Sequence, residues 1–432
     1  MRVATLGCKV NQYETELVRQ GLTGDGYRDA GDGEAADLCV VNTCTVTNEG
    51  DVKSRQLIRR LHRSNPDARI VVMGCYATRD PDAVAKLPGV TDVLTDKREL
   101  PDLMMRQGVR TPPDGISRFP GRRRAYVKVQ DGCLLRCSYC IIPHVRPSLN
   151  SRPVEAVVAE VRRLAEAGHR EVVLTGIHLG HYGVEWNRHR PKDEWTRLSH
   201  LVRRLASLPG DFRIRLSSIE ATEVTRELID VIADHPDRIC PHVHLCLQSG
   251  SDAVLRRMRR RWSSRTFLNR CELLRGRVDS DIAITTDVIV GFPGESDEDF
   301  QRTCEVSRRA GFSLIHVFPF SPRRGTPAAE MDGAVPREVR SERVDRLRRL
   351  SDELRTGYAE RLVGRSAEVL IEDRRPMAGL NGSRGVAVSG TTQHYVTADV
   401  EGVDGRPGDL MTGQIYAAAD GRVAIRPTGS RG

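Results

Sequence analysis

Six of the eleven cysteines in this chain fall into two sets of three, and these sets constrain the fold more than any other feature. The first set is compact, with the spacing C-x3-C-x2-C at Cys133, Cys137 and Cys140. The second set is dispersed, and each member follows a short apolar run: Cys8, Cys44 and Cys75. Such runs are typical of buried parallel strands, whose carboxyl ends meet at one edge of an open sheet. We therefore expect the dispersed cysteines to converge.

Cysteine thiolates hold iron–sulfur clusters, usually four to a [4Fe–4S] cluster. A set of three leaves one iron open to a substrate or cofactor, so the two sets predict two such clusters. Zinc is the main alternative, because His144 extends the first set to C-x3-C-x2-C-x3-H. The other cysteines lie in apolar stretches and are expected to be buried: Cys39, Cys240, Cys246, Cys271 and Cys304.

Composition sets broader limits. The 432 residues suggest two to four domains, and a net charge of +9 is compatible with nucleic-acid binding. However, 61 of the 67 basic residues are arginine, a skew that codon composition explains, so a solvated basic surface is an equal alternative. No apolar run approaches the ~20 residues of a membrane span. The first residues, MRVATLGCKVNQ, lack a basic segment followed by an apolar one, so we do not expect them to be a secretory signal. We expect a cytoplasmic protein without a membrane partner, in which disulfides are disfavoured.

Hydrophobic patterning divides the chain into three parts. Residues 1–115 alternate apolar strands with helical stretches at 12–22 and 51–62, which predicts a parallel α/β domain. A Pro/Gly/Arg-rich stretch at 111–124 is interpreted as a linker. A long helix is expected over 335–362, and residues 366–427 alternate in short runs that predict a small antiparallel β-barrel.

The middle part, residues 116–362, contains repeated strand–helix units. Strands are expected at 125–130, 171–175, 213–217, 242–248, 282–290 and 314–320. Six such units predict a partial (β/α)6 barrel, in which the site lies at the carboxyl ends of the strands. Residues at or near those ends are Cys133, Gly176, Glu220, Gln248 and Gly291.

The first set, with Tyr139 before its last cysteine, resembles the radical S-adenosylmethionine (SAM) signature. The ordered strings LGCKVNQYETE, NTCTVT, MGCYA, LTGIHLG, RLSSIE, HLCLQSGSD, TTDVIVGFPGE and HVFPFSPRRGTPA resemble the methylthiotransferase family over nearly the whole chain. This resemblance implies three domains: an N-terminal domain with an auxiliary cluster (1–115), a radical SAM core with its trailing helix (116–362) and a TRAM-like RNA-binding domain (363–432).

The resemblance also implies cofactors and roles. Two [4Fe–4S] clusters are expected, one on Cys133, Cys137 and Cys140 that binds SAM and one on Cys8, Cys44 and Cys75 that carries the inserted sulfur. A low-potential electron donor of the flavodoxin or ferredoxin type is expected as a partner. Residues expected to contact SAM are Tyr139, Thr175, Gly176, Glu220, Gln248 and Gly291. Ordinary hydrogen bonding at the barrel mouth explains Glu220 and Gln248 equally well.

The opening string LGCKVNQYE resembles the branch of the family that acts on N6-threonylcarbamoyladenosine beside the anticodon, at position 37 of tRNA. The branch acting on isopentenyladenosine reads GCQMN there, and the branch acting on a ribosomal protein reads LGC-x-KN. Both substrates remain alternatives, as does a non-enzymatic, zinc-stabilised RNA-binding module. One loop departs from the family pattern, because HVRPSLNSRP has Pro147 in place of glycine and Asn150 in place of arginine.

Overall fold

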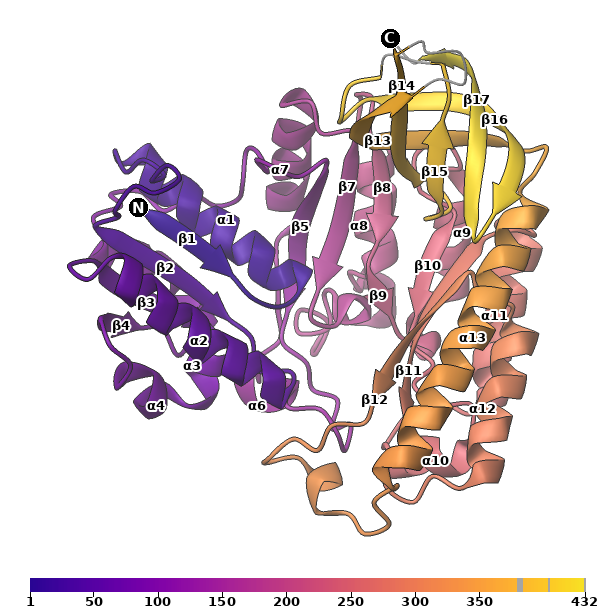
Figure 1. The fold of residues 1–432 in the computed structure, drawn as a ribbon, viewed down its shortest axis with the longest axis horizontal. Coiled ribbons are helices and arrows are strands. Elements are labelled where there is room, and N and C mark those ends of the chain that lie inside the picture. The colour runs from indigo at the N-terminus through magenta and orange to yellow at the C-terminus, as the bar shows by residue number, and fades with distance from the viewer. Residues whose placement is uncertain (379–383, 403–404, 431–432) are drawn as a thin grey trace.

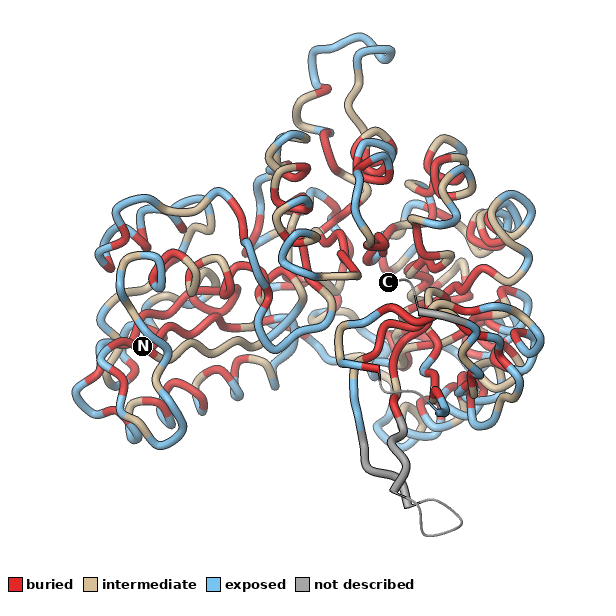
Figure 2. The backbone as a smooth tube through the Cα atoms, turned by 90° about the horizontal axis from the view of Figure 1, so that it is seen from above, coloured by how far each residue is buried: buried red, intermediate tan, exposed pale blue. Residues whose placement is uncertain are grey.

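The computed structural model describes residues 1–378, 384–402 and 405–430, which form an N-terminal parallel sheet, a half-barrel and a small closed barrel (Figure 1). Buried residues are concentrated in the strands and on the inward faces of the helices (Figure 2). In the described part of the chain, every helix is too short or too polar to cross a bilayer.

The N-terminal part is a parallel sheet in the order β1-β2-β3-β4, with bounds Arg2–Thr5, Leu38–Thr43, Arg69–Gly74 and Val90–Val93. Helices cover both of its faces: α1 Lys9–Gly24, α2 Asn48–Ser64, α3 Cys75–Arg79, α4 Pro81–Ala85 and α5 Leu100–Arg106. Because side chains alternate along a strand, Val41 packs in the core under α2 while Val40 packs in the core under α1 and α5. The expected parallel α/β arrangement is confirmed.

The half-barrel has six main strands: β5 Arg124–Asp131, β7 Glu171–Gly176, β8 Arg213–Leu216, β10 His242–Leu245, β11 Ala283–Val290 and β12 Leu314–Pro319. With the short strands β6 Asn150–Ser151 and β9 Ser218–Ile219 they form two sheets, in the orders β6-β5-β7-β8 and β9-β10-β11-β12. The helices are α6 Ile142–Val145, α7 Val154–Glu166, α8 Leu198–Ala206, α9 Arg226–Asp234, α10 Asp252–Arg257, α11 Ser264–Arg277, α12 Asp297–Ala310 and α13 Arg337–Arg361. The partial barrel expected from the six strand–helix units is confirmed.

The stretch at 111–124, interpreted as a linker, is anchored to the half-barrel. Ile116 and Phe119 are buried in its core. The Ile116 amide donates a hydrogen bond to Glu160 of α7 at 2.7 Å. Two apolar side chains among glycines and prolines are enough to fix this segment.

The C-terminal part is a closed barrel in the order β13-β14-β15-β17-β16, with bounds Ser366–Ala378, Arg384–Thr392, Thr397–Val400, Arg422–Ser430 and Leu410–Ala419. Its core includes Tyr358, Ala359 and Leu362 from the end of α13. The expected small β-barrel is confirmed, but it is not wholly antiparallel, because β15 pairs with β17 in parallel. The long helix joins the barrel to the half-barrel.

A buried ion-pair group docks the small barrel onto the half-barrel. Arg213 and Arg215 of β8 donate to the buried carboxylate of Glu171 at 2.7 and 2.8 Å. The same guanidinium groups donate to the backbone carbonyls of Thr391 and Thr392 at 2.9 and 3.1 Å. Each charge therefore has partners, as a buried charge requires.

The turn between β14 and β15 lies against the amino-terminal end of β10 in the half-barrel. Tyr395 adopts a left-handed conformation, with φ of 63°. Its ring stacks on His242 at a centroid distance of 4.6 Å, and the Arg215 guanidinium lies 5.2 Å from its centroid. We call Tyr395 and His242 the lumen floor.

Candidate functional site: two cysteine sites between the sheets

The loop after β5 carries the first cysteine set. Gly132, with φ of 81°, turns the chain at a point where a Cβ would collide with the Ser148 carbonyl at 1.9 Å. The Cys133 amide donates to the Arg146 carbonyl at 3.1 Å, which closes the loop. Burial raises the pKa of Cys140 to about 12, and the neighbouring thiols of Cys133 and Cys137 act in the same direction. The three thiols therefore lie close together.

Arg260 supplies a positive charge to this set. Its guanidinium donates to the Cys137 sulfur at 3.1 Å and lies 3.4 Å from the Tyr139 hydroxyl. It also forms an ion pair with Glu220. Burial raises the pKa of Cys137, and the charge of Arg260 opposes that effect. Arg260 thus favours the thiolate form that binds iron.

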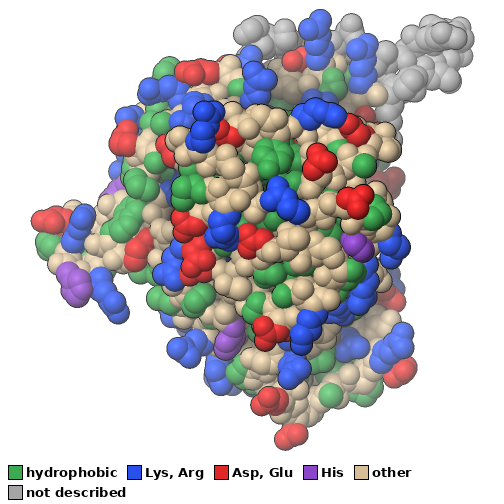
Figure 3. Space-filling model, turned by 90° about the vertical axis from the view of Figure 1, so that its left-hand side faces the viewer, with side chains coloured by type: hydrophobic (Ala, Val, Ile, Leu, Met, Phe, Trp, Pro, Cys, Tyr) green, Lys and Arg blue, Asp and Glu red, His purple; other side chains and the backbone are tan. Residues whose placement is uncertain are grey.

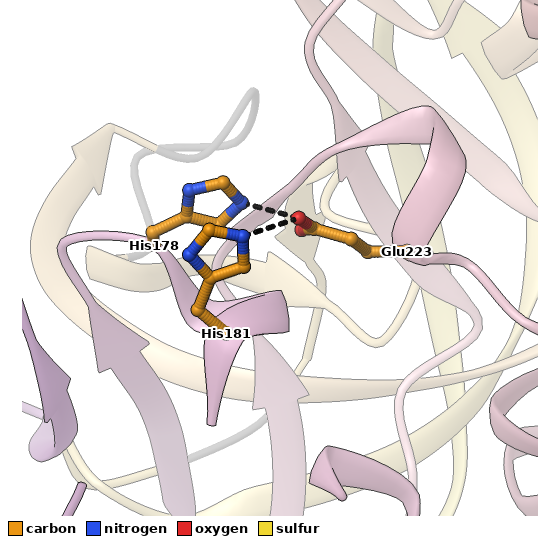
Figure 4. A group of neighbouring side chains, drawn as sticks. All are labelled: His178, His181 and Glu223. Carbon is orange, nitrogen blue, oxygen red and sulfur yellow. Dashed lines mark hydrogen bonds and ion pairs between the residues drawn. The ribbon is translucent and has the colours of Figure 1, made fainter. Parts of the chain in front are cut away.

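A second cationic group faces Cys133, within a cluster of His178, His181 and Glu223 (Figure 4). The Nδ1 atom of His178 lies 3.3 Å from the Cys133 sulfur, and its Nε2 atom lies 2.6 Å from Glu223. Burial opposes the charge on His178, but these two hydrogen bonds raise its pKa to about 9. Burial and the charge of His178 lower the pKa of the stacked His181 to about 4. His178 is therefore the charged donor to the sulfur.

The dispersed set lies at the carboxyl ends of β1, β2 and β3. Cys8 and Cys75 begin α1 and α3, and Cys44 follows β2 directly. Burial raises the pKa of Cys44, and the charges of Cys75 and Cys8 also raise it. A Cβ on Gly7 would lie 3.3 Å from the Cys44 sulfur, so Cys44 adjoins the segment that leads into Cys8. Gly74, with φ of 104°, leaves no room for a side chain, because a Cβ there would lie 2.3 Å from the Thr43 backbone.

Asparagine side chains support this second site. The Asn11 amide donates to the carbonyls of Leu6 and Thr43 at 2.9 and 3.0 Å, which ties together the loops after β1 and β2. Asn42 donates to the Asn11 carbonyl at 2.9 Å. The asparagines therefore shape the loops that hold the cysteines.

Arg146 joins the two sites. It follows the first set in sequence, and its guanidinium donates to Asn11 at 3.1 Å, to Glu14 at 2.7 Å and to Asp131 at 2.7 Å. All four side chains are buried or nearly so. In addition, Cys75 packs against Ile141 of the first-set loop. The two sites are therefore neighbours.

The spacing of the sulfurs suits a cluster better than one metal ion. In the described residues, groups of three ligand atoms within 4.8 Å of one another occur at His178/His181/Glu223 and His244/Asp287/His316, and neither cysteine set is among them. A tetrahedral zinc ion with bonds of ~2.3 Å would hold its sulfurs closer than that. His144, the fourth ligand in the zinc alternative, is exposed. The residues present fit [4Fe–4S] clusters with one open iron each.

Of the residues expected to contact SAM, Tyr139 and Glu220 are linked to the first set through Arg260. Thr175 and Gly176 end β7, next to Gln130 of β5. Gln248 has φ of 68° and pairs through its backbone with Asp287 and Ile289. Their contacts with SAM stay predictions.

Two of these residues have other partners in the structure. Glu220 pairs with Arg260, which is itself hydrogen-bonded to Cys137. Gly291 has φ of 76°, and a Cβ there would lie 2.6 Å from the Arg340 side chain of α13. Helix packing is therefore a second reason for glycine at this position.

The loop that departs from the family pattern borders a cavity of about 750 Å³. Pro147, Ser148 and Leu149 line one side, and Glu223 and Trp195 line others. Arg152, further along the same loop, is held by Tyr13 of α1 at 3.0 Å. The proline therefore faces a space beside the first cysteine site.

Sequence reasoning missed several residues of the site: Arg146 as a bridge between the two cysteine sites, His178, Glu223 and Arg260. His178 lies inside the quoted string LTGIHLG, but nothing in that string shows that it faces Cys133. Arg260 is one of 61 arginines, so composition hides it. The remaining cysteines, from Cys39 to Cys304, are buried as expected.

Comparison with known proteins defines the class first. Residues 127–306 match the radical SAM superfamily, and residues 1–96 match a family described as "Uncharacterized protein family UPF0004". The fold is similar to that of the radical SAM methyltransferase TsrM from Kitasatospora setae, with a TM-score of 0.55, 15% identity, and coverage of 76% of this chain and 75% of that one. The half-barrel and its compact cysteine set are those of a radical SAM enzyme.

Relatives narrow the assignment. The chain is 42% identical to a Bacillus subtilis protein named threonylcarbamoyladenosine tRNA methylthiotransferase MtaB, over 85% of this chain and 84% of the relative. It is 40% identical to the Thermotoga maritima protein of that name, over 86% of each. It is 35% identical to a tRNA-2-methylthio-N(6)-dimethylallyladenosine synthase of Corynebacterium urealyticum, over 95% of this chain and 78% of the relative. This chain belongs to the family of radical SAM methylthiotransferases.

Proposed function

We propose that this chain inserts a methylthio group at C2 of N6-threonylcarbamoyladenosine at position 37 of tRNA. The observation that carries the proposal is the juxtaposition of two three-cysteine sites across Arg146. The names of the relatives at 40–42% identity support the nucleoside. The 35% identity to dimethylallyladenosine synthases makes isopentenyladenosine the second candidate.

The two cysteine sites have different roles in the proposed reaction. Cys133, Cys137 and Cys140 would hold a [4Fe–4S] cluster with SAM at its open iron, and Cys8, Cys44 and Cys75 would hold the second cluster. When bound, one SAM and the first cluster would supply a 5′-deoxyadenosyl radical that takes the hydrogen from adenine C2, the second cluster would supply the sulfur, and a second SAM would supply the methyl group. The chain itself places the adenine C2 between the two sites.

Protein side chains set the electrostatics of the first site. Arg260 and the charged His178 each donate a hydrogen bond to a cysteine sulfur. Positive donors at the sulfurs stabilise the reduced, more negative cluster, and so favour electron uptake from a low-potential donor. We propose a flavodoxin or ferredoxin as that donor.

The C-terminal barrel is proposed to be a TRAM-like domain that binds tRNA, with domain limits 1–115, 116–362 and 363–432. The face formed by the N-terminal part mixes basic and acidic side chains without a large field of one sign (Figure 3). A basic chain with that face is better suited to hold RNA elsewhere. We place the reaction in the cytoplasm, because its substrate is tRNA.

The test is mass spectrometry of tRNA nucleosides from a strain that lacks this gene. We expect 2-methylthio-N6-threonylcarbamoyladenosine to disappear and its unthiolated precursor to accumulate. Complementation with the wild-type gene should restore the product, and a Cys44→Ala gene should not. Loss of the methylthio mark from isopentenyladenosine instead would establish the second candidate.

A further inference from the structure

The inner face of the half-barrel carries polar side chains that the cysteine sites do not use. Along β10, Val243 and Leu245 point outward into the core under the helices. Because side chains alternate along a strand, His244 points to the inner face. The register places His244 beside Thr285 on β11, and Asp287 beside His316 on β12.

Three of these side chains form a compact group, which we call the lumen triad: His244, Asp287 and His316. Their ligand atoms lie within 4.8 Å of one another, and all three residues are half-buried. The Nε2 atom of His244 lies 3.4 Å from Asp287, and the two imidazole rings lie 5.7 Å apart. His244 is oriented by Thr285, whose hydroxyl lies 2.9 Å from Nδ1.

The lumen triad has unused hydrogen-bonding capacity. Among the described residues, no hydrogen bond reaches the Asp287 carboxylate or either ring nitrogen of His316, and the buried Nε2 atom of His244 has none of good geometry. Polar groups in a protein interior normally have partners, and those that lack them call for an explanation. A ligand that enters the lumen would supply the missing partners.

Lys9 brings a positive charge to the same space. It occupies the first turn of α1, directly after Cys8, and α1 packs against β5 and β7 of the half-barrel (Figure 1). Burial lowers the pKa values of His242 and His316, and the ammonium group of Lys9 contributes to both shifts. Lys9 forms no ion pair with any described residue. Lys9 is half-buried on a helix that adjoins the half-barrel, so its ammonium group is a charge without an ion-pair partner among the described residues.

The triad occupies a defined level of the lumen. On the side of the amino-terminal ends of the strands lies the lumen floor, formed by Tyr395 and His242. Above it, the Asp287 carbonyl accepts a hydrogen bond from Gln248, at the carboxyl ends where the first cysteine set lies. Lys9 adjoins Cys8 of the second set. A nucleobase held between the two cysteine sites would direct a substituent toward this level.

We propose that Lys9 and the lumen triad bind the polar N6 substituent of the substrate adenine, and so select a purine whose substituent ends in a carboxylate. This inference rests on the proposed function and deepens it. The threonylcarbamoyl group offers a carboxylate, a hydroxyl and urea N–H groups. Lys9 matches the carboxylate, Asp287 accepts from a donor, and the two imidazoles match the hydroxyl or carbonyl. An isopentenyl chain would offer none of these four groups a hydrogen-bond partner.

The test compares the affinity of the reconstituted full-length protein for three RNAs. The RNAs are anticodon stem–loops that carry N6-threonylcarbamoyladenosine, its methyl ester, or unmodified adenine at the target position. Lys9→Gln and His316→Phe are the test variants. Lys53→Gln is the matched control, because Lys53 is exposed on α2 and pairs only locally with Glu49. Iron content and cluster absorbance verify that each variant holds both clusters.

We expect wild type and Lys53→Gln to bind the carboxylate form roughly ten-fold or more tightly than the ester, as a charge-assisted hydrogen bond implies. Lys9→Gln should bind the two forms equally, and His316→Phe should lose part of the preference over unmodified adenine. Full discrimination in Lys9→Gln would overturn the role of Lys9. Wild type that methylthiolates the nucleoside but does not distinguish the three RNAs would overturn the site alone, whereas wild type that does neither would overturn the proposed function as well.

A metal ion is the competing occupant of the lumen triad. In that case, protein from the Cys44→Ala/Cys137→Ala double variant would retain a stoichiometric ion after treatment with a mild chelator, and His316→Phe would remove it. Elemental analysis decides the matter. Such an ion would overturn the proposal, and its absence together with the affinity differences above would support it.

Discussion

At the scale of single residues, His178 is the group whose removal has the sharpest expected effect on the first cysteine site. His178→Phe deletes the hydrogen bond to the Cys133 sulfur and the positive charge beside it. We expect the reduction potential of that cluster to become more negative, and SAM cleavage to slow by about ten-fold or more. A redox titration followed by electron paramagnetic resonance measures the potential. His189→Phe, on the exposed loop after β7, is the control, and an unchanged potential in His178→Phe would contradict the role.

The two cysteine sites make separable predictions. Cys137→Ala removes a ligand of the SAM-binding cluster, so 5′-deoxyadenosine formation should stop. Cys44→Ala leaves that site intact, so some SAM cleavage should remain while no methylthiolated nucleoside forms. Product analysis after anaerobic reconstitution distinguishes the two. Sulfur insertion by Cys44→Ala would show that the dispersed set is not the sulfur-carrying site.

At the scale of structural elements, the ion-pair group under β7 and β8 holds the small barrel in place. Glu171→Gln removes the counter-charge of the buried Arg215 and leaves the buried Arg213 only its pair with Glu368 at 3.3 Å. We expect a loss of roughly 3–5 kcal/mol in the free energy of unfolding, measured by urea denaturation. Asp230→Asn breaks an exposed pair with Arg277 and should leave the free energy of unfolding nearly unchanged. Equal effects would mean that Glu171 does not compensate the two arginines.

The same group predicts a pH dependence. The charges of Arg215 and Arg213 hold the pKa of Glu171 well below its usual value, although burial opposes them. A carboxyl whose folded pKa is lowered stabilises the fold fully above its unfolded pKa of about 4.3 and loses that contribution as the pH falls further. Wild type should therefore lose stability below about pH 4 more steeply than Glu171→Gln. Parallel curves would contradict this assignment.

Strand–helix order was accessible from the sequence, because apolar runs mark strands whether or not their partners are known. The sequence does not show which inward-facing side chains of neighbouring strands lie at the same height in the half-barrel. His244, Asp287 and His316 are far apart in the chain, and only the register of β10, β11 and β12 brings them together. The interpretation of 111–124 as a linker misses its anchoring in the core, because its two buried side chains form no periodic pattern.

At the scale of the whole molecule, the proposed binding of RNA by the small barrel is testable through salt dependence. Arg406 and Arg426 are exposed on that barrel. Replacing both with glutamine should weaken tRNA binding and lower the slope of log affinity against log salt by about 0.7–0.9 for each phosphate that the barrel no longer neutralises. Arg302→Gln, on the exposed side of α12, is the control. An unchanged slope would place the electrostatic contact elsewhere.

The six cysteines of the two sites could be predicted from the sequence, but the charged side chains that surround them could not. The motifs identify all six cysteines and the order of the three parts. Charged partners such as Arg146 and Arg260 come from loops and strands that meet only in the folded chain. In a sequence with 61 arginines, no local signal separates the few that are buried.

The stacked pair of Tyr395 and His242 has a consequence for the route of the nucleotide. Because Tyr395 and His242 stack at the amino-terminal ends of the strands, we expect an adenosine to enter and leave on the side of the cysteine sites. An adenine within a folded anticodon loop would have to flip out of its stack to enter the half-barrel. The product, larger by a methylthio group, must leave the same way, so a nucleotide that remains seated blocks the next turnover.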